Sequence, residues 1–319
     1  MFENFRNDYV QNVLPALFEN ASLSSVNSVG WTKSGDSSFS LELPNKTLLE
    51  IAPRYQALES ETYVHFTNLK ALFSIINEGS LRLYNLNNSN DPKEFEHNLN
   101  NIEDLSDFNF SKYKSKVHLL SLCNSNILNS KNILNMWRLY GDGGYGVAIK
   151  FKISRVNYHY TNCLLAKVNY DILELGPFIK AHNDFKHRNK LIESDIIDII
   201  KIPALLHKSY LYSIEEEIRM VIIEGGSFYI KSLNNPKLFC NDINNRNETI
   251  SYLNIPLFSN DDNYPRLEIK EVQIGFRYSD SQFGEIDSVF QDSCRNYNAS
   301  VKGNFYIKCS QSDLKNSFR

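Results

Sequence analysis

Three short stretches of the sequence carry side chains that could do chemistry. In the first, "YVHFT" at residues 63–67, strand alternation predicts that His65 and Thr67 share one face with Tyr63. Two hydrogen-bonding side chains on one sheet face each need a partner, because an unpaired buried polar group is costly. The pair is therefore a candidate binding site, and a core histidine satisfied by a backbone carbonyl is the alternative for His65.

The second stretch is "NMWRLYG", which ends with Tyr140 before a glycine-rich turn. Ile133, Met136, Trp137 and Tyr140 recur at i, i+3, i+4 and i+7, which predicts one apolar stripe of a helix. Core packing accounts for all four side chains. A place at the helix end would instead let the Tyr140 ring face a pocket.

The third stretch is "SIEEEIRMVII", at the start of a predicted strand. Alternation puts one set of side chains on the buried side, Ile218, Met220 and Ile222, and the other set opposite, Glu215, Glu217 and Arg219. A solvated edge in which Arg219 pairs with Glu217 is the simplest interpretation. A carboxylate fixed at a strand end is also what a reaction needs when it builds positive charge on a sugar.

The polar loop "NSNDPKE" adds Asn90, Asp91 and Glu94. Asp91 can cap a helix that starts with Pro92, and a role at the rim of a pocket is the alternative. The seven histidines and five cysteines show no metal-ligand spacing, so we expect no metal site.

Composition limits the class of protein. The chain has 319 residues, of which 42% are hydrophobic and 13% aromatic, so it can bury a full core. A net charge of -3 gives no basic field of the kind that drives non-specific nucleic-acid binding. The sequence begins without a signal-peptide pattern and contains no apolar run near ~18 residues, so we expect no membrane span. The cysteines are scattered along the chain and odd in number, which favours a reducing cytoplasm as the location.

The elements that must position the candidate residues follow from periodicity and turn signals. Residues 4–20 predict an amphipathic helix broken at Pro15, and residues 1–58 are interpreted as a helical and loop appendage to one domain at 59–319. A strand at 62–66 and a helix at 68–78 precede Gly79, which is expected to end that helix in the left-handed conformation. A further helix is expected at about 190–209, bent at Pro203.

The rest of the chain is rich in short strands. "GDGGYG" at 141–146 is interpreted as a hairpin turn, and one helix is expected around 279–295. Short Gly and Asn turns between strands favour antiparallel pairing. The predicted class is α+β, with a mixed, mainly antiparallel two-sheet core and peripheral helices.

Two resemblances suggest more. The segments "HFTNLKALFSIINEGSLRL", "NDPKE", "SLC", "MWRLYGDGGYGVAIKF", "EEEIR" and "EVQIGF" resemble, in this order from about Tyr63 to Ser310, the bacterial family of domain of unknown function 2971 (DUF2971). More distantly, the order of an HxT strand, a helix with a tyrosine and an ExE strand is similar to the NAD-dependent ADP-ribosyltransferases. This second resemblance implies the ADP-ribosyltransferase fold.

The second resemblance also implies roles for the candidates. His65 would bond the adenosine ribose of NAD, while the backbone beside it, at Phe66 and Thr67, would hold the nicotinamide amide. Tyr140 would stack on the nicotinamide ring. Glu217 would bond the nicotinamide ribose and stabilise its oxocarbenium ion, and Glu215 would orient the acceptor. The remaining expected NAD contacts are Arg82 or Arg138 at the pyrophosphate and Asn90 and Asp91 at the rim.

The expected function is therefore transfer of ADP-ribose from NAD to a macromolecular acceptor, protein or nucleic acid, or hydrolysis of NAD. NAD is the substrate in both cases. The resemblance suggests a bacterial toxin or phage-defence effector that works in the cytoplasm, as a monomer or a homo-oligomer. The alternative is a non-catalytic module that senses a ligand or binds another protein on the same fold.

Overall fold

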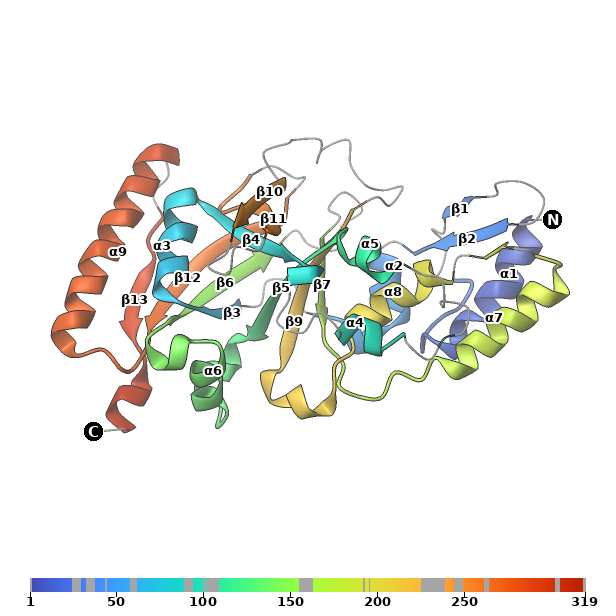
Figure 1. Cartoon of the computed structure of the whole chain (residues 1–319), viewed down its shortest axis with the longest axis horizontal. Coiled ribbons are helices and arrows are strands. Elements are labelled where there is room, and N and C mark those ends of the chain that lie inside the picture. Colours follow the sequence, from blue (N-terminus) through green and yellow to red (C-terminus); the bar gives the residue numbers. More distant parts are fainter. Residues whose placement is uncertain are drawn as a thin grey trace.

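The structure is a computed structural model, and Figure 1 shows its elements around a central sheet. It describes residues 2–24, 30–32, 38–43, 45–57, 62–88, 94–99, 102, 109–154, 163–191, 193–194, 196–224, 239–243, 249–260, 264–301 and 305–317. Helices α3 and α9 lie at one end of the molecule, and the N-terminal helix α1 lies with α7 at the other end (Figure 1).

The α-helices in this part of the chain are α1 Phe2–Asn12, α2 Asn45–Ile51, α3 Leu69–Glu78, α4 Glu94–His97, α5 Phe110–Lys114, α6 Ile133–Leu139, α7 Gly176–Arg188, α8 Ile197–Leu205 and α9 Asp280–Val301. Short 3-10 helices connect other elements: η1 Leu14–Ala16, η2 Pro53–Tyr55, η3 Leu86–Asn88, η5 Ser125–Asn129, η6 Asp142–Gly144, η7 Tyr210–Glu215 and η8 Asp313–Ser317.

The strands are β1 Gly30–Thr32, β2 Ser38–Glu42, β3 Thr62–Thr67, β4 Ser80–Asn85, β5 Val117–Asn124, β6 Val147–Ser154, β7 Cys163–Lys167, β8 Glu193–Ser194, β9 Glu217–Ile223, β10 Phe239–Ile243, β11 Thr249–Pro256, β12 Arg266–Ile274 and β13 Lys308–Gln311. The mixed α+β class is confirmed.

The core is one ten-stranded sheet, so the expected pair of sheets is wrong. Its main path is β10-β11-β4-β5-β3-β6-β12-β13, and β9 joins β5 to β7. The ladders are antiparallel except for β12 with β13. Because β5 pairs with β3, β4 and β9, it joins strands from distant parts of the chain in one sheet. A separate three-stranded sheet, β1-β2-β8, lies beside the N-terminal helices (Figure 1).

The sheet divides along β5. At one end, β5 pairs with β4 through Tyr84 opposite Leu119, and at the other end it pairs with β3 through Val64 opposite Cys123. Between these two short ladders, Leu120, Ser121 and Leu122 have no register partner on either of the described strands β3 and β4. On its other side β5 pairs with β9 continuously from Val117 to Cys123. The division exposes the middle of β5 between two diverging strands.

The signals around α3 act as expected. Asn68 caps the helix by accepting a 2.8 Å hydrogen bond from the Ala71 N–H, and Gly79 ends it with φ 62°. The predicted strand and helix on either side of Asn68 are confirmed. The helix that follows β3 therefore starts at a fixed point next to His65 and Thr67.

Alternation along the strands separates two faces of the sheet. One face packs against α3 and α9 through residues such as Tyr63, Met220 and Phe290. The opposite face packs against α6 near β3, where Val64 and Phe66 meet Trp137. Towards β7 and β9, the same opposite face packs against the N-terminal segment with α7 and α8.

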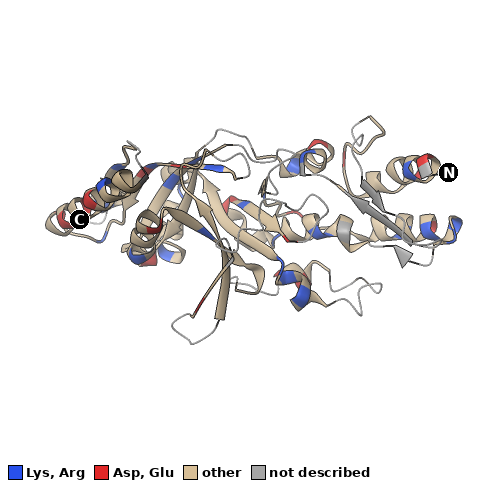
Figure 2. Ribbon diagram, turned by 90° about the horizontal axis from the view of Figure 1, so that it is seen from above, with Lys and Arg blue, Asp and Glu red and all other residues tan. Residues whose placement is uncertain are grey.

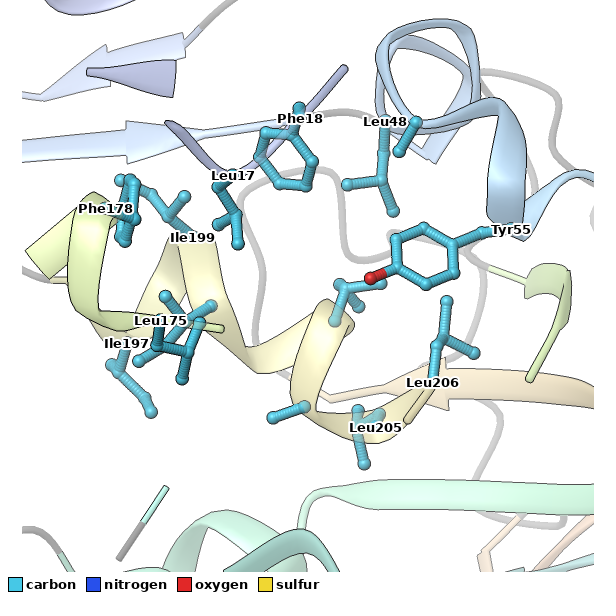
Figure 3. Close-up of a cluster of buried hydrophobic side chains, with 14 of the residues drawn as sticks. Leu17, Phe18, Leu48, Tyr55, Leu175, Phe178, Ile197, Ile199, Leu205 and Leu206 are labelled. Atoms are coloured by element: carbon cyan, nitrogen blue, oxygen red, sulfur yellow. The ribbon is translucent and has the colours of Figure 1, made fainter. Parts of the chain in front are cut away.

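The N-terminal segment contributes to a large apolar cluster that Figure 3 shows in close-up. Leu17, Phe18 and Leu48 lie there beside Phe178 from α7 and Ile199 from α8. Residues before β3 thus share a core with helices that follow β7. The division at residue 58 stays a prediction.

Two local predictions are wrong. The helix expected at about 190–209 is shorter, α8 with Pro203 inside it, and α7 precedes it without having been predicted. "GDGGYG" is not a hairpin turn, because it connects α6 to β6 through η6, with φ 62° at Gly143 and 95° at Gly144. Glycines favour a turn between two strands and between a helix and a strand alike, so the sequence does not distinguish a hairpin from the observed connection.

Charged side chains of both signs are interspersed along the ribbon in Figure 2, as the net charge of -3 suggests. Among the described helices, none combines the length and the hydrophobicity that a membrane span requires.

Candidate functional site

A pocket of about 590 Å³ lies where β3 and β4 separate along β5. This volume falls in the range of about 300–1,000 Å³ that is typical of small-molecule sites. Six residues to which the ADP-ribosyltransferase resemblance gives a role line it: His65, Phe66, Thr67, Tyr140, Glu215 and Glu217. They come from β3, the C-terminal end of α6, η7 and the start of β9. The chain separates them by up to about 150 positions, and the fold brings them to one cavity.

Both side-chain oxygens of Glu217 accept hydrogen bonds from neighbouring residues of the pocket. Its Oε1 accepts hydrogen bonds from Ser121 Oγ at 2.5 Å and from Arg219 Nε at 2.9 Å. Its Oε2 accepts from Arg219 Nη2 at 3.1 Å and from Lys208 Nζ at 3.3 Å. Burial alone would raise the pKa of Glu217, but the charges of Arg219 and Lys208 and the hydrogen bonds outweigh it and lower the pKa to about 2. Glu217 is therefore a carboxylate at any physiological pH.

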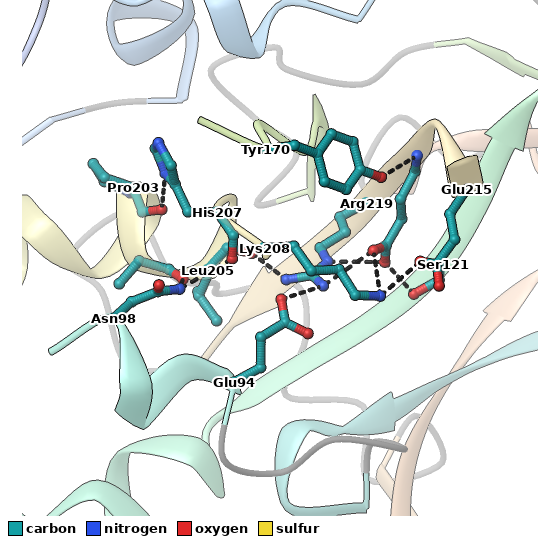
Figure 4. Close-up of polar contacts among 12 residues, drawn as sticks. Glu94, Asn98, Ser121, Tyr170, Pro203, Leu205, His207, Lys208, Glu215 and Arg219 are labelled. Atoms are coloured by element: carbon teal, nitrogen blue, oxygen red, sulfur yellow. Dashed lines mark hydrogen bonds and ion pairs between the residues drawn. The ribbon is translucent and has the colours of Figure 1, made fainter. Parts of the chain in front are cut away.

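Arg219 lies two residues after Glu217 on β9, and its guanidinium bonds the Glu217 carboxylate. Its guanidinium also bonds Glu94 Oε1 at 2.7 Å and the carbonyl of Leu205. Burial opposes the charge of Arg219, but Glu217 and Glu94 outweigh it and raise its pKa. The side chain is 6% exposed, so the pair is a buried ion pair with its donors in use (Figure 4).

Glu215 lies on the other side of the same cluster. It accepts hydrogen bonds from the Tyr140 hydroxyl at Oε1 and from Lys208 Nζ at Oε2, the latter at 2.6 Å. Burial, followed by the contact with Glu215, raises the pKa of Tyr140, so its phenol stays protonated. Glu216 between the two acids has φ 46°, the left-handed conformation that ends η7 before β9 begins. This reversal lets Glu215 and Glu217 face the same cavity although only Glu217 belongs to the strand.

His65 is half-buried, and its Nδ1 lies 3.1 Å from the carbonyl oxygen of Ser121. A carbonyl only accepts, so Nδ1 carries the proton of this hydrogen bond. Burial lowers the pKa of His65, and the bond to Ser121 opposes this only in part. The neutral ring therefore offers Nε2 as a hydrogen-bond acceptor. The alternative of a core histidine satisfied by a backbone carbonyl is therefore correct for one ring nitrogen, Nδ1.

The remaining predicted residues lie elsewhere. Arg82 on β4 is not among the residues that line the pocket, and its guanidinium pairs with Glu78 at 2.8 Å and stacks over the ring of Tyr252 at 4.3 Å. Arg138 is exposed and likewise absent from the lining. Asn90 and Asp91 lie outside the described residues. Glu94 does line the pocket, as the partner of Arg219.

Ser121 and Lys208 are pocket residues that sequence reasoning missed. Ser121 is the single hydroxyl in the apolar run "VHLLSLC", and a polar residue on the outward side of a buried strand was the available signal. Lys208 lies three residues after the end of α8, and no sequence pattern links it to the acids seven and nine positions later. Cys123 also lines the pocket, where burial raises the pKa of its thiol and leaves it a poor nucleophile.

Chemically, the pocket combines three glutamates, of which Glu217 is held as a carboxylate, with two fixed cations, a neutral imidazole acceptor and a phenol. Such a cluster can orient hydroxyl groups and stabilise a positive charge that develops beside Glu217. In the part of the chain that the structure describes, no group of three or more His, Cys, Asp or Glu side chains is placed to hold a metal ion.

Comparison with known proteins gives one match. A family model described as "Protein of unknown function (DUF2971)" matches residues 136–220, from α6 to the middle of β9, a segment that contains Tyr140, Lys208, Glu215 and Glu217. No curated protein and no solved structure matches the chain. The match covers 85 of the 319 residues of the chain.

Proposed function

We propose that the protein binds NAD in this pocket and cleaves the bond between nicotinamide and ribose, transferring ADP-ribose to a macromolecular acceptor or to water. One observation carries the proposal: His65, Tyr140 and Glu217, three residue types suited to this reaction, line one cavity. In this proposal the fold is like that of the ADP-ribosyltransferases, and each residue has the role that the distant resemblance implies. The protein would act as a toxin or a phage-defence effector.

The reaction needs little covalent chemistry from the protein. The electron pair of the glycosidic C–N bond moves to the pyridinium nitrogen, so nicotinamide leaves neutral and C1′ of the ribose becomes an oxocarbenium ion. An acceptor hydroxyl, amine or water then forms the new bond to C1′ and loses its proton to solvent. The protein must hold the substrate and stabilise the positive charge in a site that excludes water.

The residues of the pocket suit these tasks. Glu217 provides a permanent negative charge whose position is fixed by Ser121 and Arg219. His65 Nε2 can accept a hydrogen bond from a ribose hydroxyl, because Nδ1 is turned to the Ser121 carbonyl. The Tyr140 ring provides an aromatic face next to Glu215.

A second candidate function is non-catalytic sensing of the same ligand. It is favoured by the contacts of Glu217, since each of its oxygens already accepts two hydrogen bonds within the protein. A carboxylate with no free acceptor site stabilises a pocket without necessarily acting on a substrate.

The test is incubation of the purified full chain with NAD, with nicotinamide release followed by chromatography. We expect release by the wild type and none by Glu217→Gln, while Glu216→Gln, a change at the exposed neighbouring acid, retains it. Glu217→Gln also removes one of the two carboxylate partners of Arg219 and so lowers the melting temperature. His65→Gln provides a second variant at a residue outside the ion-pair cluster. All assays are run below the lowest melting temperature.

The outcomes separate the candidates. A rise of the melting temperature with NAD but no nicotinamide release supports the sensor. Neither release nor a thermal shift in the wild type rejects NAD as the ligand.

A further inference from the structure

Lys208 occupies the space between the two acids of the pocket. Its Nζ lies 2.6 Å from Glu215 Oε2 and 3.3 Å from Glu217 Oε2. The ammonium also lies over the ring of Tyr212, 4.6 Å from its centroid, and the side chain is 12% exposed. Lys208 therefore contacts both carboxylates at once, from a residue that belongs to neither of their elements.

The two acids need a cation at this point. Glu215 and Glu217 are each 4% exposed and both line the pocket, so their like charges are placed together away from water. Arg219 forms ion pairs with Glu217 and Glu94, and none with Glu215 among the ion pairs of the described residues. Among the described ion pairs, Lys208 is the link between Glu215 and Glu217. Without it, one carboxylate of the pair would be easier to protonate.

The backbone around Lys208 is fixed on both sides. The Lys208 N–H donates to the Asn169 carbonyl at 3.0 Å, and Asn98 Nδ2 donates to the carbonyls of Ala204 and His207 at 2.9 and 3.0 Å. The His207 ring packs edge-on against Tyr55 from the N-terminal segment, with centroids 5.6 Å apart. Figure 4 shows Asn98 and His207 near Lys208. The contact of Tyr55 with His207 adds support from the N-terminal segment.

We propose that Lys208 is a positioning residue, which holds Glu215 and Glu217 side by side as carboxylates in the pocket and is itself supported by the N-terminal segment through His207. The link to catalysis rests on the proposed function, whereas the effect of Lys208 on Glu217 does not. The titratable and charged groups that face Glu215 and Glu217 are Glu94, Cys123, Tyr140, Tyr170 and Arg219.

The decisive measurement is the titration of the Glu217 side-chain carboxyl by ¹³C NMR in full-length protein labelled at glutamate, assigned through Glu217→Gln. In Lys208→Met we expect the Glu217 pKa to rise by about 1–3 units, the usual effect of losing an adjacent opposite charge. Lys208→Gln, which keeps a donor but no charge, should give the same rise if the methionine variant folds poorly. Lys208→Arg should restore the wild-type titration, and Lys180→Met, on the exposed face of α7, should leave it unchanged.

An unchanged Glu217 titration in both uncharged variants would overturn the proposal, whatever the protein does with NAD. If the wild type cleaves NAD, the acid limb of its kcat/KM profile should also move to higher pH in Lys208→Met and return in Lys208→Arg. If the wild type does not cleave NAD, the proposed function fails, and the titration still decides the role of Lys208.

Discussion

Ser121 is hydrogen-bonded to Glu217 and to His65 at the same time. Its hydroxyl donates to Glu217 Oε1 at 2.5 Å, and its carbonyl accepts from His65 Nδ1 at 3.1 Å. The division of the sheet makes this possible, because β3 and β4 diverge at the middle of β5 and leave the Ser121 carbonyl to a side chain. The relative position of the imidazole and the carboxylate therefore depends on one residue between them.

Replacing Ser121 should show this dependence. Ser121→Ala removes a hydrogen bond to a buried charge, so we expect unfolding free energy to fall by about 1.5–3 kcal/mol. The Glu217 pKa should rise, because the Ser121 hydroxyl is one of the groups that lower it. Urea unfolding measures the stability, with Ser111→Ala on the exposed side of α5 as the control. A change no larger than that of Ser111→Ala would show that the 2.5 Å contact contributes nothing.

Several parts of this arrangement follow from sequence. Alternation separates Glu217 and Arg219 from Ile218 and Met220, and Asn68 and Gly79 mark the ends of α3. These signals are local, since each depends on side-chain period or on the backbone conformation of one residue.

What sequence does not provide is the pairing of strands distant in the chain. Whether β5 joins two groups of strands or lies at the edge of a sheet depends on partner strands up to about 100 positions away. The two arrangements give the same alternation of side chains along β5. For the same reason Ser121 and Lys208 carry no signal of their own, since their importance comes from Glu217 across the fold. Arg82 has the right residue type, but its strand position turns it towards Glu78 and Tyr252.

The buried pair of Arg219 and Glu217 should be costly to break. Arg219→Met removes the guanidinium that pairs with both Glu94 and Glu217 and leaves Glu217 with Lys208 alone. Removing one partner of a buried ion pair costs about 3–5 kcal/mol. The matched control is the half-exposed pair of Lys46 and Glu50, 4.0 Å apart, where Lys46→Met should cost at most about 1 kcal/mol. Urea unfolding of both variants at pH 7 makes the comparison. Equal losses would mean that the Arg219 pair is as weak as one at the surface.

Stability should fall at acid pH through His207. The ring is 2% exposed, and burial lowers its pKa to about 4, below the value of about 6.5 expected in the unfolded chain. The unfolded state therefore binds the proton first, so stability is retained above pH 6.5 and lost as the pH falls towards 4. The loss amounts to about 3 kcal/mol at completion. His207→Asn, measured by urea unfolding at pH 7 and pH 4.5, should lose less between these two values than the wild type, and an equal loss would contradict the assignment.

Two glycines should respond to alanine in opposite directions. A Cβ at Gly146 would lie 2.3 Å from the carbonyl oxygen of Thr67, a pocket residue, and 2.7 Å from the backbone of Gly141. Backbone has to move to make room, so Gly146→Ala should destabilise the protein and disturb the pocket. Gly284 lies inside α9 with nothing within 4 Å of its Cβ position, and Gly284→Ala should stabilise by about 0.5–1 kcal/mol through helix propensity. Thermal unfolding compares the two, and a Gly146→Ala variant as stable as the wild type would show that β6 does not approach β3 as closely as these distances require.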